Sequence, residues 1–79
     1  RDPHRLLEQG ELRTAIDRAI GELPLPYREA FVLRYIDELP IKEVAELLGE
    51  SVAATKSRVL RARLAVRDRL AKQFEGHNG

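Results

Sequence analysis

A turn signal between two helical patterns is the feature that most constrains how this chain can fold. Before the turn, four apolar residues follow the spacing i, i+3, i+4, i+7 of a short amphipathic helix: Ile41, Val44, Ala45 and Leu48. Gly49 comes next, where helices commonly end in the left-handed conformation that glycine tolerates best. Ser51 is well suited to be the N-cap of a following helix. Two helices so closely joined predict a helix-turn-helix.

Two further helices are predicted before this motif. One apolar stripe at helical spacing covers Leu12, Ala15, Ile16, Ala19, Ile20 and Leu23. Pro24 and Pro26 stop that helix, and Pro26 suits the first turn of the next one, which runs through YREAFVLRYID. Apolar residues cover more than one face of this second helix, so we expect its neighbours to wrap it.

The sequence therefore predicts an all-α fold, a small four-helix domain with a C-terminal helix-turn-helix. We assign residues 11–75 to this domain. Residues 1–10 carry no apolar stripe and are predicted to be a linker or a frayed N-terminal segment. Residues 76–79 are predicted to be a disordered tail.

Composition excludes several function classes. The chain has 79 residues, which is enough for one small domain, and it has no cysteine, so disulfides and thiolate metal sites are impossible. No apolar run approaches the roughly 18 residues of a membrane span, and a cytoplasmic location is predicted. The histidines, His4 and His77, lie at opposite ends of the chain, and no phosphate-binding glycine loop or Ser/His/Asp set is present. We expect no cofactor, no metal and no enzymatic activity.

Charge is unevenly distributed along the chain. Residues 1–50 carry seven Lys/Arg and eleven Asp/Glu, a net charge of −4, whereas residues 51–79 carry seven Lys/Arg and two acids, a net charge of +5. Such polarity indicates either a polyanion or acidic partner for the C-terminal part, or simply a basic helix exposed to solvent.

The directions of the side chains on the last helix favour a polyanion as its partner over a helix that is simply exposed to solvent. At about 100° per residue, the predicted buried stripe is Val52, Val59, Ala62, Val66 and Leu70. The face opposite this stripe holds Ala53, Ala54, Ser57, Leu60 and Arg61. Lys56 and Arg63 flank that face on one side and Arg58 on the other. Arg61 can hold a guanine edge or a phosphate. Leu60 can touch a thymine methyl or an apolar partner, although an ordinary surface leucine is the alternative.

A long motif adds a family resemblance. The run LPLPYREAFVLRYIDELPIKEVAELLGESVAATKSRVLRAR resembles region four of bacterial sigma factors of the extracytoplasmic-function (ECF) group, and the match covers roughly residues 11–70. The resemblance implies that the last helix enters the major groove of the upstream (minus-thirty-five) promoter element. It implies contact with the β-subunit flap of RNA polymerase and, in many members, coverage by an anti-sigma factor. The DNA contacts carried over by position are Arg34, Lys42, Ser51, Ala53, Ala54, Lys56, Ser57, Leu60, Arg61 and Arg63.

Some individual roles stay open at this level. Arg34 fits a salt bridge to Asp37 or Glu38 as well as it fits a phosphate contact. Tyr27, Phe31 and Tyr35 recur at helical spacing, which is typical of core packing, with base stacking as the alternative. Thr55 stands where the family has an apolar core residue, so its hydroxyl would need a partner.

Two other functions compete with promoter recognition. The same helix-turn-helix could be the effector domain of a response-regulator-type transcription factor, and such domains are typically dimeric. The chain could also act chiefly as a protein-interaction module for an anti-sigma factor, a role that is compatible with promoter binding at another time. For the sigma-factor domain we expect a monomer that binds DNA but does not start transcription alone.

Overall fold

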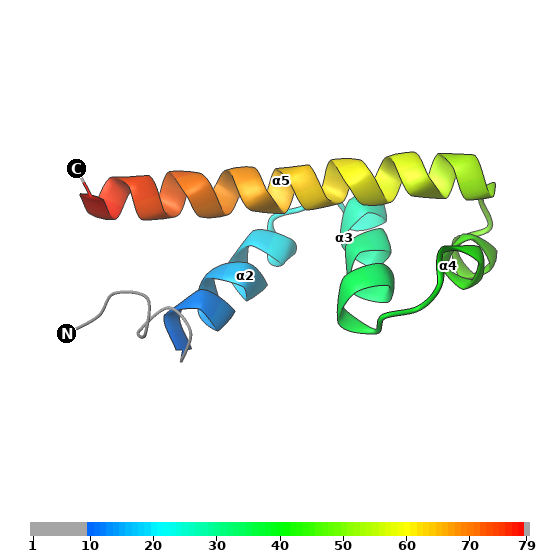
Figure 1. Cartoon of the computed structure of the whole chain (residues 1–79), viewed down its shortest axis with the longest axis horizontal. Helices are drawn as coiled ribbons and strands as arrows, with labels where there is room; N and C mark the ends of the chain where they lie inside the picture. The colour runs from blue at the N-terminus through cyan, green and yellow to red at the C-terminus, as the bar shows by residue number, and fades with distance from the viewer. Residues whose placement is uncertain (1–9, 79) are drawn as a thin grey trace.

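The computed structural model describes residues 10–78, and within them the chain is built of helices without a strand. Figure 1 shows four helices, α2 (Leu12–Gly21), α3 (Leu25–Phe31), α4 (Ile41–Leu48) and α5 (Val52–Asn78). A π-helical segment, η2 (Val32–Ile36), continues α3 directly. The predicted all-α class and the four-helix domain with a C-terminal helix-turn-helix are confirmed.

The described residues end close to the predicted domain bounds. Residues 1–9, which make up nearly all of the predicted linker, and residue 79 lie outside the described residues. Helix α5 continues to Asn78, beyond the predicted domain end at residue 75.

Helix α5 is the platform on which the other helices pack. It is a rod of 27 residues, and α2, α3 and α4 lie on the same side of it in Figure 1. The buried residues Ala62 and Val66 of α5 form one apolar cluster with residues of α2, α3 and the turn between them: Ala19, Ile20, Leu23 and Phe31. Ala62 is fully buried and adds little bulk, so the shorter helices approach α5 closely at this position.

The turn between α4 and α5 has the predicted geometry. Gly49 is left-handed, with φ 69° and ψ 32°. The N–H of Glu50 donates to the carbonyl of Ala45 at 3.0 Å and that of Gly49 to Glu46 at 3.3 Å, which is the hydrogen-bond pattern of a Schellman motif. Ser51 Oγ then accepts from the N–H of Ala54 at 3.0 Å and caps α5. These bonds satisfy two of the carbonyls left unpaired at the end of α4 and one of the N–H groups left unpaired at the start of α5.

The second predicted helix differs from the expectation. Its last turn is π-helical, with the N–H of Asp37 donating to the carbonyl of Val32 at 2.9 Å. A π turn holds one extra residue and rotates the side chains after it relative to a regular helix. As a result Tyr35 and Ile36 reach the surface, so the expectation that neighbours wrap the whole helix was wrong at these positions. Core packing holds for Phe31, which is buried with its ring centroid 5.0 Å from that of Tyr35.

We predict that Gly49→Ala destabilises the domain by about 1–2 kcal/mol, the cost of a left-handed non-glycine residue. Space is not the cause, because no heavy atom lies within 4 Å of the added Cβ. Urea unfolding measures the change. Gly21→Ala is the matched control: Gly21 also has nothing within 4 Å of an added Cβ, but it ends a right-handed helix. That control should gain about 0.5–1 kcal/mol. Equal effects of the two substitutions would contradict the backbone argument.

We also predict that Thr55→Val stabilises the domain by about 1 kcal/mol. Thr55 is fully buried on α5, and its Oγ1 has no hydrogen-bond partner. A buried hydroxyl without a partner costs about 1–3 kcal/mol, and valine replaces it with a methyl of similar size. Thermal unfolding measures the gain. Thr14→Val, on the exposed side of α2, should change the melting temperature little. A loss of stability in Thr55→Val would mean that the hydroxyl has a partner.

Candidate nucleic-acid interface

The outward face of α5 is open to solvent over its first turns. Ala53, Ser57 and Arg61 are exposed and Ala54 is half-buried. Leu60, on the same face, is 47% exposed. The opposite stripe is buried at Val59, Ala62 and Val66, half-buried at Leu70 and exposed at Val52, because Val52 is the first residue of the helix. The predicted orientation of α5 is therefore correct except at its first residue.

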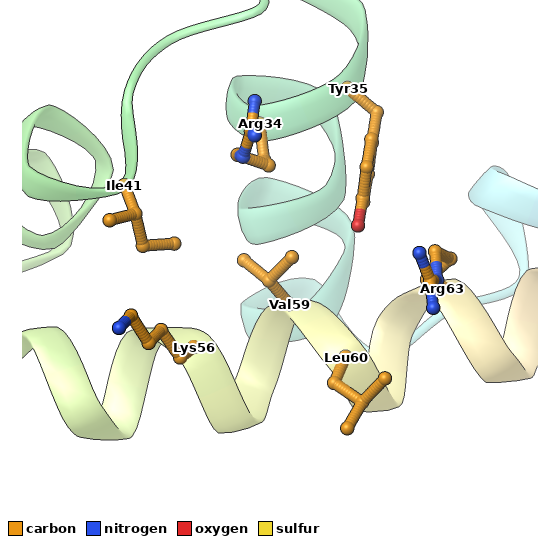
Figure 2. Close-up of a pocket in the computed structure, with 7 residues that line it drawn as sticks. All are labelled: Arg34, Tyr35, Ile41, Lys56, Val59, Leu60 and Arg63. Carbon is orange, nitrogen blue, oxygen red and sulfur yellow. The ribbon is translucent and has the colours of Figure 1, made fainter.

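Three cations meet beside this face at a shallow apolar hollow of about 330 Å³. Its lining comes from η2, α4 and α5 and consists of Arg34, Tyr35, Ile41, Lys56, Val59, Leu60 and Arg63. In Figure 2, Tyr35 reaches from η2 toward α5, Val59 points back toward α3, and Leu60 projects from the other side of α5. No carboxylate lines the hollow. The three cations on its rim suit a phosphate backbone beside a groove.

Arg34 is held at the edge of this hollow. Its Nη1 donates to the carbonyl of Leu39 at 3.4 Å, and its guanidinium carbon lies 5.7 Å from the centroid of the Tyr35 ring. In the described part of the chain, no ion pair joins Arg34 to Asp37 or Glu38, so that alternative is excluded in this structure. Neither carboxylate therefore neutralises the guanidinium, which adds its positive charge to the edge of the hollow.

The remaining predicted contacts take separate positions. Ser51 is exposed, and its oxygen is used as the cap of α5. Lys42 is exposed on the first turn of α4, outside the hollow. Arg34, Lys56, Leu60 and Arg63 come together at the hollow, whereas Ser51, Ala53, Ala54, Ser57 and Arg61 lie along the first three turns of α5 and at its cap.

Two residues of the hollow were missed at the level of sequence. Tyr35 was assigned to the core because regular α-helical spacing was assumed, and η2 rotates it to the surface. Ile41 was assigned to the apolar stripe of α4 alone, yet it is only half-buried and also lines the hollow. No local sequence signal marks either role.

Within residues 10–78, no group of three His, Cys, Asp or Glu side chains could hold a metal ion. His4 lies outside the described residues. Among the helices that the structure describes, none is both long and apolar enough to cross a membrane.

Together, the short helix, the left-handed glycine turn and the basic second helix define the class of helix-turn-helix DNA-binding domains. Comparison with known proteins gives the family. Residues 13–66 match the family model of sigma-70, region 4. The chain belongs to this family, as region 4 of an ECF sigma factor.

Three curated relatives are sigma factors, and two of them are named as ECF sigma factors. The chain is 43% identical over 60 residues to the ECF RNA polymerase sigma factor SigW of Bacillus subtilis, covering 76% of the chain and 32% of the relative. It is 35% identical over 60 residues to RNA polymerase sigma factor SigV of the same organism, covering 76% of the chain and 36% of the relative. It is 37% identical over 65 residues to the ECF RNA polymerase sigma-E factor of Escherichia coli, covering 82% of the chain and 34% of the relative. The chain thus spans about a third of the length of these relatives.

We predict that Arg34→Gln weakens binding to all duplex DNA alike. Loss of one phosphate contact should lower the magnitude of the slope of log affinity against log salt by about 1. Fluorescence anisotropy over a salt series measures the slope. Arg13→Gln is the matched control, because Arg13 is exposed on α2 and lies 3.9 Å from Asp17. An unchanged slope in Arg34→Gln would remove Arg34 from the interface.

Proposed function

We propose that this domain recognises the upstream (minus-thirty-five) promoter element with α5 in the major groove. The observation that carries the proposal is the exposed face of Ser57, Leu60 and Arg61 directly opposite the buried stripe of α5. A helix fits the major groove, where arginine pairs with guanine and apolar side chains meet the thymine methyl. The small residues Ala53 and Ala54 let the first turn of α5 approach the bases closely.

The cations around the hollow would fix the position of the helix on the DNA. Arg34, Lys56 and Arg63 line the same hollow on one flank of α5, where one phosphate strand would run if α5 lies in the groove. Lys42 on α4 adds a further phosphate contact in this arrangement. Phosphate contacts set affinity and register, and base-edge contacts set the sequence. We assign Arg61, Ser57 and Leu60 to the bases and the four cations to the backbone.

We also propose that RNA polymerase binds a different surface, so that DNA and polymerase can be held together. A larger hollow of about 640 Å³ lies between α3, η2, α4 and the start of α5. Its apolar wall is formed by Val32, Leu33, Leu47 and Leu48, and its polar lining includes Glu50 and Arg58. Leu47 is 63% exposed there. An apolar segment of the β-subunit flap would cover this surface. An anti-sigma factor that covers the domain would compete for one or both surfaces.

The chain would act as a monomer in the cytoplasm, and by itself it would bind a promoter without starting transcription. The match to sigma-70 region 4 sets aside the response-regulator effector, which was the alternative for the same helix-turn-helix. Sedimentation equilibrium of the isolated domain tests whether it is a monomer.

We predict that Arg61→Ala loses sequence discrimination. A base-edge contact is worth about 1–3 kcal/mol, so binding to a selected duplex should weaken by that amount while binding to random duplex changes little. Selection from a duplex pool followed by anisotropy measures both. Lys56→Ala is the comparison variant and should weaken binding to both duplexes equally. If Arg61→Ala also weakens both equally, Arg61 holds a phosphate and promoter recognition by this face is not supported.

A further inference from the structure

The two flanks of α5 differ in how their cations are used. On one flank, Lys56 and Arg63 border the hollow, whose lining contains no carboxylate. On the other flank, Arg58 and Glu50 both line the larger hollow, and Nη2 of Arg58 lies 3.4 Å from Oε2 of Glu50. These two side chains are only 25% and 38% exposed. An ion pair that is partly shielded from water is weakened less by salt than a fully exposed one. The second flank is therefore neutralised by the protein itself.

Glu50 also occupies a distinctive place in the motif. It follows the left-handed Gly49 and precedes the N-cap Ser51, so its backbone is fixed by the hydrogen bond to Ala45 at 3.0 Å. The carboxylate is thereby anchored at the N-terminal end of α5. This is the end of a helix that favours negative charge, and it is also where a DNA phosphate would approach. Glu50 both engages Arg58 and opposes a second anion at this end.

We propose that Glu50 is a positioning residue that withholds Arg58 from the DNA backbone. The domain would then neutralise phosphates through cations on only one flank of α5. Without Glu50, the guanidinium of Arg58 would be free to reach the phosphates of the strand on its own flank. This inference rests on the proposed placement of α5 in the major groove.

The test uses Glu50→Gln, which keeps the size of the side chain and removes its charge. We expect tighter binding to both selected and random duplex, and a salt slope that is steeper by about 0.9, the value for one additional phosphate. Arg58→Ala alone should leave the slope unchanged. In the double variant Glu50→Gln/Arg58→Ala, the slope should return to that of the parent. A purely structural ion pair would change thermal stability without steepening the slope.

Asp17→Asn is the matched control. Asp17 is also an acid paired with a cation, at 3.9 Å from Arg13. Both residues lie on α2, outside the helix-turn-helix, and neither lines the cationic hollow. Its substitution should leave the slope unchanged.

The outcomes separate this inference from the proposed function. If the parent chain binds no duplex at low salt, the proposed function fails. If the parent binds and Glu50→Gln leaves the slope unchanged, the inference alone is overturned. A steeper slope that persists in the double variant also overturns it, because the gain then comes from the lost carboxylate and not from Arg58.

Discussion

The burial of one stripe of α5 is the interaction on which the rest of the structure depends. Val59, Ala62 and Val66 are covered by the shorter helices, and no other described helix is long enough to act as their common support. Once that stripe is buried, the rotation of α5 about its axis is set. The direction of Ser57 and Arg61 toward solvent is therefore a consequence of core packing.

The glycine turn supplies the second constraint, which is the angle between α4 and α5. Val44 and Ala45 are buried, so α4 cannot rotate freely against α5. The Schellman hydrogen bonds at Gly49 and the Ser51 cap follow one another directly, so every residue of the turn is held by a hydrogen bond. Because a helix-turn-helix places its second helix by means of the first, the stability of this turn is linked directly to the geometry of the proposed DNA face.

Regular periodicity accounts for the part of the fold that could be predicted from sequence. Helices α2, α4 and α5, the left-handed Gly49 and the Ser51 cap all follow from local rules, and so does the outward direction of Arg61. The π segment does not, because no proline or glycine interrupts the stretch VLRYI. The ion pair of Glu50 with Arg58 could not be predicted from the sequence either. It joins the loop before α5 to the second turn of that helix, and it depends on the rotamers of both side chains. The roles of individual residues toward DNA remain predictions.

The π segment explains how Arg34 comes to face α5. One extra residue in the last turn rotates Arg34 and Tyr35 relative to a regular helix, and the chain then reverses through Glu38, a non-glycine residue with φ 59°. Such a conformation costs on the order of 1–3 kcal/mol and persists only where surrounding contacts hold it. Here the contacts are the backbone hydrogen bond from the N–H of Leu39 to the carbonyl of Leu33 at 3.0 Å and the longer bond from Arg34 to the carbonyl of Leu39 at 3.4 Å. After the same reversal the chain enters α4 at Ile41, which lines the hollow together with Arg34. The turn therefore connects two residues of the hollow lining. The π turn, the reversal at Glu38 and the bond from Arg34 therefore lie within one short segment, which places Arg34 and Tyr35 at the same hollow as Lys56.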